Sequence, residues 1–226
     1  MGLFDSLLGR TKPTKPDLDQ LFALPSAAIT LEASLGFTPT GVGSVCFRAP
    51  EGKAFSDLQS EITALLDADA GPKVELRSDE FGYTWLVVRA DPTDIAGLVT
   101  DLHAVNSSLS DAGFGPMLLA SLVSFRDGAD RTLGLVYLFK RGSFYPFVPT
   151  TSSTSTPAAP SASATNPSAS TRPDTAPPDV APPDVTASPR QRDNVLELQV
   201  RDLLRDDVRV EPDLTRWFAV WGAPGL

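Results

Sequence analysis

A stretch of Pro, Ser, Thr and Ala, residues 150–189, limits most strongly what this chain can fold into. It contains no aromatic residue and ends in the tandem repeat APPDVAPPDV. Such a composition cannot bury enough apolar surface to offset the conformational entropy lost on folding. The pattern therefore predicts a disordered linker over 150–189. It separates a domain of residues 16–149 from a C-terminal segment of residues 190–226.

Residues 16–149 are numerous enough to form one core without a metal or disulfide bonds. The single cysteine, Cys46, has no possible partner within the chain, which favours a reducing cytoplasm. The first residues lack the apolar run and cleavage site of a secretory signal. No apolar stretch reaches the roughly 18 residues that a membrane-spanning helix needs. We therefore expect a cytoplasmic protein that meets a membrane only peripherally or through a partner.

The charge of the chain is unevenly distributed. The whole chain carries −9, of which residues 16–149 carry −8, whereas residues 1–15 carry +2. A negative field of this kind repels the phosphate backbone, so nucleic acid is not expected as a partner.

Residues 1–15 form a short amphipathic element followed by cations. Its apolar residues share one side of a potential helix, with Arg10, Lys12 and Lys15 directly after it; they are Leu3, Phe4, Leu7 and Leu8. A helix this short is not stable alone in water, so it needs a surface. That surface is the core of this protein, a partner protein or an anionic bilayer.

Hydrophobic periodicity divides residues 16–149 into alternating strands and helices. The predicted strand pairs are 28–35 with 42–48, 73–78 with 83–90, and 118–125 with 133–140. Helices are predicted at 17–23, at 53–67 and after Asp91 and Pro92, the last with the apolar stripe Ile95, Leu98, Val99, Leu102, Val105 and Leu109. This order predicts a two-layer α+β domain, with an antiparallel sheet that carries its helices on one face.

The C-terminal segment 190–226 regains apolar character. Val195, Leu198, Leu203 and Leu204 indicate an amphipathic helix, and Trp217, Phe218 and Trp221 follow close together. Such aromatic residues need a pocket, either on the domain or on another protein. A tether holds the segment at high local concentration, so we expect it to dock on its own domain.

A second aromatic run closes the domain, with Phe139, Phe144, Tyr145 and Phe147. Two interpretations stay open. The run is a core strand followed by a stiff exit, or it is a surface against which the C-terminal tryptophans pack.

The sequence offers little for catalysis, because one histidine and one cysteine are the whole supply of those two residue types. His103 lies beside the apolar stripe of a predicted helix, which favours a structural role over that of a general base. The glycine-rich stretch GVGS at 41–44 lacks the spacing of a phosphate-binding loop. Asp79 and Glu80 lie where turn chemistry explains acids. No cofactor and no metal are expected.

Several long stretches resemble one actinobacterial family, the PspA-associated protein PspAB. They are GLFDSLLGR, PSAAITLEASLGFTPTGVGSVCFRA, FGYTWLVV, DLHAVNSSL, YLFKRGSFYPF and DLTRWFAVWGAPGL. The resemblance implies an accessory protein of the phage shock system, in which PspA assembles on the stressed inner membrane. It implies PspA or another phage shock component as partner, and it supplies no catalytic residues.

Two functions follow as hypotheses. The first is a non-catalytic adaptor of envelope stress, acting by protein–protein contact near the inner membrane. The second is a regulator that binds a small molecule or peptide in a groove covered by the C-terminal segment, and an enzyme is a distant third. The candidate interaction residues are Leu3, Phe4, Leu7, Leu8, Phe144, Tyr145, Phe147, Trp217, Phe218 and Trp221.

Overall fold

A computed structural model describes residues 16–48, 56–57, 60, 64, 74–150 and 190–226. The predictions for the amphipathic segment 1–15, for most of the helix 53–67 and for the linker beyond residue 150 lie outside these residues.

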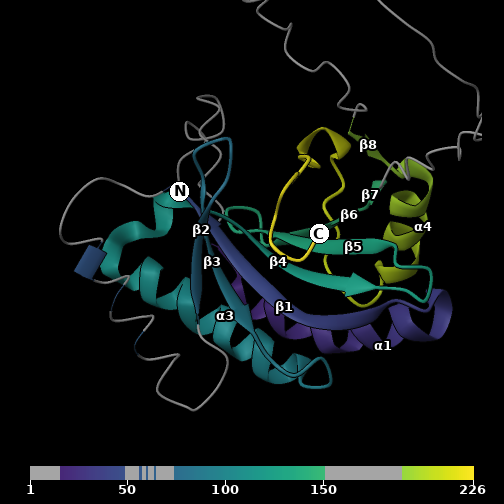
Figure 1. The fold of residues 1–226 in the computed structure, drawn as a ribbon, viewed down its shortest axis with the longest axis horizontal. Coiled ribbons are helices and arrows are strands. Elements are labelled where there is room, and N and C mark those ends of the chain that lie inside the picture. The colour runs from purple at the N-terminus through teal and green to yellow at the C-terminus, as the bar shows by residue number, and fades with distance from the viewer. Residues whose placement is uncertain (1–15, 49–55, 58–59, 61–63, 65–73, 151–189) are drawn as a thin grey trace, which may run out of the picture.

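Six strands form one antiparallel sheet in the order β2-β3-β1-β4-β5-β6 (Figure 1). Their bounds are β1 Thr38–Phe47, β2 Glu75–Ser78, β3 Thr84–Arg89, β4 Leu118–Arg126, β5 Thr132–Leu138 and β6 Ser143–Phe147. The long strand β1 lies inside the sheet, between β3 and β4. A second sheet pairs β7 Pro149–Thr150 with β8 Gln191–Arg192.

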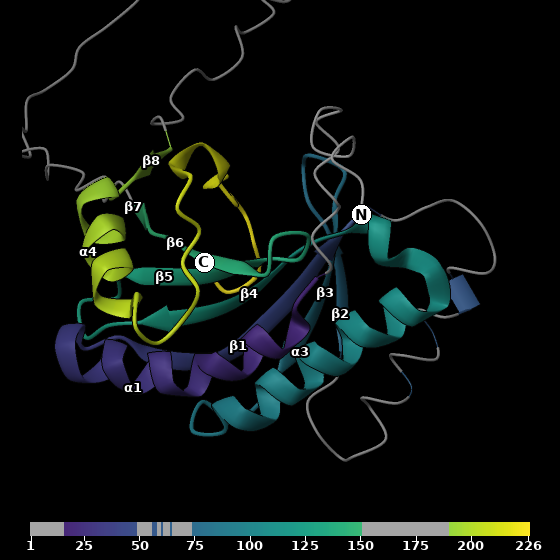
Figure 2. The same cartoon turned by 180° about the vertical axis from the view of Figure 1, so that it is seen from behind.

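The helices are α1 Leu24–Leu35, α3 Ile95–Leu109 and α4 Asn194–Leu204. Short turns of 3-10 helix occur at Leu18–Ala23 before α1, at Gly115–Met117 before β4 and at Leu214–Arg216 in the C-terminal segment, and a π-helical turn, Ser110–Phe114, follows α3. Seen from behind, α1 and α3 lie across one face of the sheet, with α4 beside its β6 end (Figure 2). The predicted α+β class, with an antiparallel sheet and helices packed against it, is confirmed.

The first predicted strand, 28–35, is wrong, because these residues belong to α1. The buried residues Leu24, Ala27, Ala28 and Leu31 recur at helical spacing. Ile29, between the buried positions, is 71% exposed, so the buried residues do not alternate as they would in a strand. Gly36, in the left-handed region at φ 72°, ends the helix. The predicted partner 42–48 is real but begins earlier, at Thr38, and pairs with β3 and β4 instead.

The helix predicted after Asp91 and Pro92 is confirmed as α3. Leu98, Val99, Leu102, Val105 and Leu109 are buried as its stripe requires. Its N-cap is Asp94, whose carboxylate accepts a hydrogen bond from the Gly97 amide at 2.8 Å. The other two predicted strand pairs are confirmed as β2 with β3 and β4 with β5.

Both faces of the sheet bury apolar side chains. On β1, Val45 and Phe47 join the core beneath the helices, whereas Cys46 between them joins a second core on the opposite face. The C-terminal segment covers part of this second face. A side chain at Gly134 of β5 would meet Leu226, and one at Gly225 would meet Ser124 of β4 and Val42 of β1, so the segment reaches the inner strands of the sheet.

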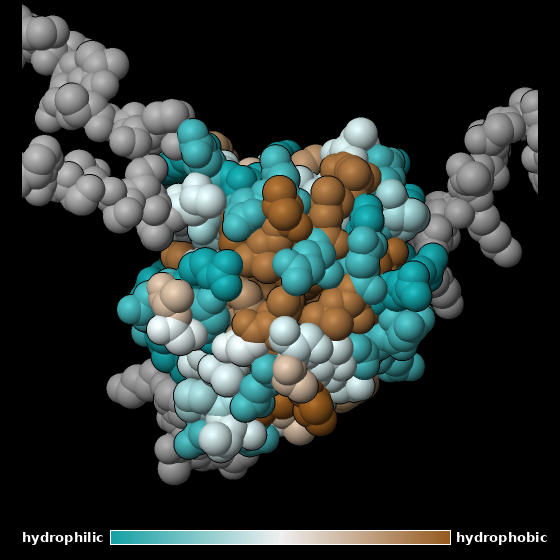
Figure 3. Space-filling model, turned by 90° about the vertical axis from the view of Figure 1, so that its right-hand side faces the viewer, coloured by the Kyte–Doolittle hydropathy of each residue, from teal (hydrophilic) through white to brown (hydrophobic). Residues whose placement is uncertain are grey.

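The apolar stripe of α4 differs from the predicted one. Leu196, Val200 and Leu204 are buried, whereas Val195 is 79% exposed and Leu198 is 37% exposed. On the side of the molecule where α4 lies, apolar residues gather in the middle with hydrophilic residues around them (Figure 3). Among the described residues, no helix is both long enough and apolar enough to cross a bilayer.

Candidate binding pocket beneath the C-terminal segment

The C-terminal segment joins the sheet at its outer edge. The Phe144 amide donates to the Arg209 carbonyl at 2.8 Å, and the Glu211 amide donates to the Phe144 carbonyl at 2.7 Å. Val210 thus forms a parallel bridge with Phe144. Residues 209–211 cover the edge of β6, which would otherwise offer unpaired backbone groups to another chain.

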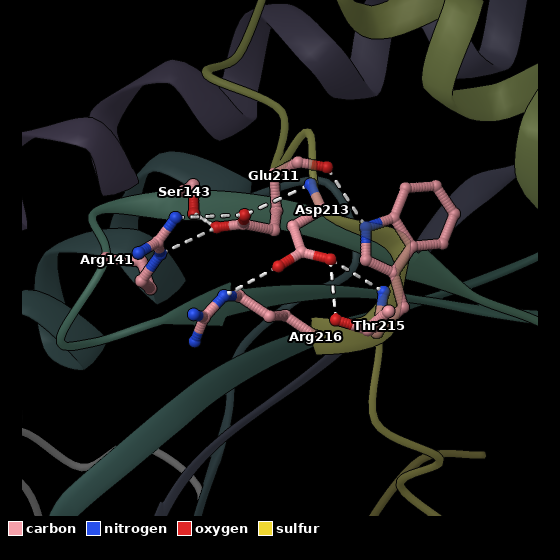
Figure 4. A network of polar contacts seen from close by, with 7 residues as sticks. Arg141, Ser143, Glu211, Asp213, Thr215 and Arg216 are labelled. Atoms are coloured by element: carbon pink, nitrogen blue, oxygen red, sulfur yellow. Dashed lines mark hydrogen bonds and ion pairs between the residues drawn. The ribbon is translucent and has the colours of Figure 1, made fainter.

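Glu211 is the buried anchor of this junction, and Figure 4 shows its contacts. Its carboxylate accepts hydrogen bonds from the Arg141 guanidinium at 3.1 and 3.2 Å and from the Ser143 hydroxyl at 2.6 Å. Burial raises the pKa of Glu211, but the hydrogen bonds from Arg141 and Ser143 outweigh it, so the pKa lies below its ordinary value. The carboxylate therefore stays charged and holds the segment in place.

Two tryptophans dock on β6 beyond this anchor. Trp217 stacks on Tyr145 with ring centroids 6.0 Å apart, and Trp221 meets Phe147 edge to face at 4.9 Å. The Trp217 indole N–H donates to the Glu211 carbonyl at 3.1 Å. The predicted docking of the C-terminal segment on its own domain is confirmed for both tryptophans.

The aromatic run 139–147 contains a core strand and also a surface against which the C-terminal tryptophans pack, because β6 buries both of its faces. Phe144 contributes to the core under the helices, whereas Tyr145 and Phe147 face the C-terminal segment. Phe139 is buried just after β5. For Phe218, the expected docking is wrong, because its side chain is 60% exposed; only its carbonyl is engaged, by the Tyr145 hydroxyl at 3.0 Å.

A second buried acid, Glu197 of α4, connects this helix with the end of β6 and with the C-terminal segment. Glu197, 2% exposed, forms an ion pair with Arg192 at 2.9 Å and accepts the Val148 amide at 2.9 Å. Arg192 also donates to the Trp217 carbonyl at 2.8 Å. The ion pair Arg192–Glu197 and its hydrogen bonds thus hold together the end of β6, the start of α4 and the segment that carries Trp217.

A pocket of about 730 Å³ lies where the C-terminal segment leaves the sheet uncovered. Its floor is the helix-free face of five strands, with Cys46, Trp85, Ala120, Leu138 and Tyr145. One wall is the β2–β3 hairpin with Phe81 and Tyr83, and the other is formed by Arg216 and residues 218–221. Phe81 and Phe218 line the pocket while being 56% and 60% exposed, which places them at its mouth.

Asp79 shapes the hairpin wall of the pocket. Its carboxylate accepts from the amides of Phe81 at 2.9 Å and Tyr83 at 2.8 Å, and from the Trp85 indole N–H at 2.9 Å. These hydrogen bonds close the turn and fix the orientation of the Trp85 indole in the floor. The interpretation of Asp79 as a turn residue agrees with this geometry.

The pocket floor carries one thiol, that of Cys46. Burial, and next the charge of Asp79, raise the pKa of the Cys46 thiol to about 12, so the thiol stays protonated at neutral pH. His103 lies on α3 beneath the other face of the sheet, with its ring 4.9 Å from Phe22. Cys46 and His103 therefore cannot act as a pair. In the described part of the chain, no three His, Cys, Asp or Glu side chains form a group suited to a metal ion.

The structure brings together part of the predicted interaction set. Tyr145, Phe218 and Trp221 line the pocket, while Trp217 and Phe147 support it from the side. Leu3, Phe4, Leu7 and Leu8 lie outside the described residues. Sequence reasoning missed Trp85, Arg141 and Glu211. The aromatic cluster FGYTW was a usable signal for the first, but nothing local marks the partners of Glu211.

The fold is an α+β domain in which the chain's own C-terminal segment forms one wall of a pocket on the sheet. The chain belongs to the PspA associated protein B family, whose model matches residues 1–159 and 182–225. The resemblance drawn from the sequence is thereby confirmed. No curated protein and no solved structure matches the chain.

Proposed function

We propose that this protein is a non-catalytic adaptor of the PspA envelope-stress system, acting by protein–protein contact in the cytoplasm beside the inner membrane. Membership of a family named for its association with PspA supports this role. The proposed partner is PspA itself or another component of the phage shock system.

The observation that carries the proposal is the aromatic pocket and its mouth. Phe81 and Phe218 expose large apolar rings on either side of an apolar hollow, an arrangement typical of anchor sites in protein interfaces. The Cys46 thiol on its floor stays protonated at neutral pH, because burial raises its pKa. The site is therefore suited to binding apolar side chains.

Affinity purification of the full chain from cells under envelope stress tests this function. We expect PspA to copurify with the wild type and to be depleted severalfold with Phe218→Ser. Leu214→Ser is the matched control, because Leu214 is 50% exposed on the same segment but does not line the pocket. Failure of PspA to copurify with the wild type contradicts the adaptor role. If PspA is depleted equally with both variants, the contact with PspA lies outside the pocket.

A second candidate function is a regulator that binds a small molecule or peptide. The pocket volume favours it, since about 730 Å³ falls in the range of ligand sites. Native mass spectrometry of the purified full chain tests this reading, because a bound metabolite adds a fixed mass. If the mass measured under mild conditions equals that of the polypeptide alone, the purified protein retains no ligand and this function is contradicted.

A further inference from the structure

We propose that the pocket is the docking site of the chain's own amphipathic segment, residues 1–15, through Leu3, Phe4, Leu7 and Leu8. This inference goes beyond the adaptor role and does not depend on PspA. It gives the segment a resting place in the free protein, from which a partner or a bilayer would have to withdraw it.

The point where the described chain begins supports this occupant. The Tyr137 hydroxyl donates to the Asp17 carbonyl at 2.8 Å, and a side chain at Gly142 would lie 3.2 Å from Asp17. Lys140 and Arg141, directly before Gly142, line the pocket. Segment 1–15 is therefore attached beside the β5–β6 turn that lines the pocket.

The segment has a spacer between its apolar positions and the start of the described chain, long enough to pass around the end of the sheet from the helix-bearing face, where Asp17 meets Tyr137. Seven residues, 9–15, separate the apolar positions from Pro16 and span up to roughly 23 Å when extended. A short tether of this kind gives a local concentration on the order of millimolar. At such a local concentration, even a weak apolar contact keeps the segment in the docked state most of the time.

The chemistry of the two surfaces is complementary. The segment presents four large apolar side chains, and the pocket offers an apolar floor and aromatic walls. The segment carries +2 and the domain 16–149 carries −8. Three cations line the pocket. Arg141 is paired with Glu211 and Arg216 with Asp213, so these two oppose a cationic segment only weakly, and Lys140 is the third.

The full chain with Leu7→Asp tests the inference, with Ser6→Asp as a control of equal charge on the polar side of the segment. The probe is anilinonaphthalene sulfonate, read by energy transfer from tryptophan, since Trp85 and Trp221 line the pocket. We expect little transfer in the wild type and in Ser6→Asp, and a severalfold rise in Leu7→Asp. A synthetic peptide of residues 1–15 should reverse the rise, whereas the same peptide with Leu7→Asp should not.

Equal probe signals in the wild type and both variants overturn the inference. If vesicles of anionic lipid bind the wild type but not Leu7→Asp while the probe signals stay equal, the segment belongs to the bilayer. A pocket that binds the probe in all three proteins, without competition from the peptide, is a site for a free ligand. None of these outcomes decides the adaptor role, which the copurification of PspA tests independently.

Discussion

At the residue scale, one buried carboxylate decides how the C-terminal segment is held. Glu211 is fully buried, and its two oxygens are occupied by Arg141, Ser143 and the Asp213 amide. A buried charge is tolerated only when it is paired and hydrogen-bonded in this way. Arg141 and Ser143 come from the turn before β6 and from its first residue, so the anchor exists only when the sheet and the segment are both folded.

Replacing Glu211 with Gln should change stability in a pH-dependent way. Because the folded pKa lies below the ordinary 4.5, the charge stabilises the fold above that pH and loses its effect as the pH falls through the folded pKa. We expect Glu211→Gln to lower the free energy of unfolding by roughly 1–3 kcal/mol at pH 7. Below pH 4.5 the difference from the wild type should narrow. Urea unfolding followed by tryptophan fluorescence measures the free energy of unfolding of both proteins at each pH. A difference in this free energy that does not vary with pH contradicts the role of the charge.

At the element scale, β6 is the strand on which the rest of the molecule converges. It pairs with β5 on one edge and with residues 209–211 on the other, and it buries aromatic side chains on both faces. The run SFYPF therefore lacks the alternation of a half-exposed strand, because every residue in it is buried. This is why its two interpretations could not be separated from the sequence.

Trp217 and Phe218, adjacent on the chain, should respond very differently to truncation. Trp217 is 7% exposed and stacked on Tyr145, so Trp217→Ala should cost about 3 kcal/mol or more and lower the unfolding temperature by roughly 6 °C or more. Phe218→Ala removes a ring that is 60% exposed and should change stability by less than about 0.5 kcal/mol. Differential scanning calorimetry of the two variants decides the matter, and similar shifts for both would argue against the docked geometry.

At the scale of the whole molecule, β7 and β8 bring the two ends of the predicted linker side by side. Thr150 pairs with Gln191 and Pro149 with Arg192, so residues 150 and 191 are neighbours in space. The C-terminal segment then rejoins the domain through the edge of β6, the Glu211 anchor and the two tryptophans. Segment 190–226 packs against residues 16–149, although the predicted linker separates the two in sequence.

Limited proteolysis should cut this chain between residues 151 and 189 without separating its two parts. The Ser, Thr, Ala and Pro composition predicts an accessible backbone there, whereas the docked contacts hold the C-terminal fragment by themselves. Size-exclusion chromatography of the cut protein should show both fragments in one peak. Trp217→Ala serves as the comparison and should release the smaller fragment. Resistance to cleavage across 151–189 would show that the linker prediction is wrong.

The sequence by itself determined the α+β class, the helix α3, two of the three strand pairs and the return of order after residue 190. These features rest on local periodicity, capping and composition, which act over a few residues. Only the tertiary structure decided that residues 28–35 are helical, that β1 lies inside the sheet, and that Leu196, not Val195, faces the core. The pocket also required it, because its walls come from hairpin residues near 80 and tail residues near 220. Such contacts depend on long-range burial, which no short stretch of sequence encodes.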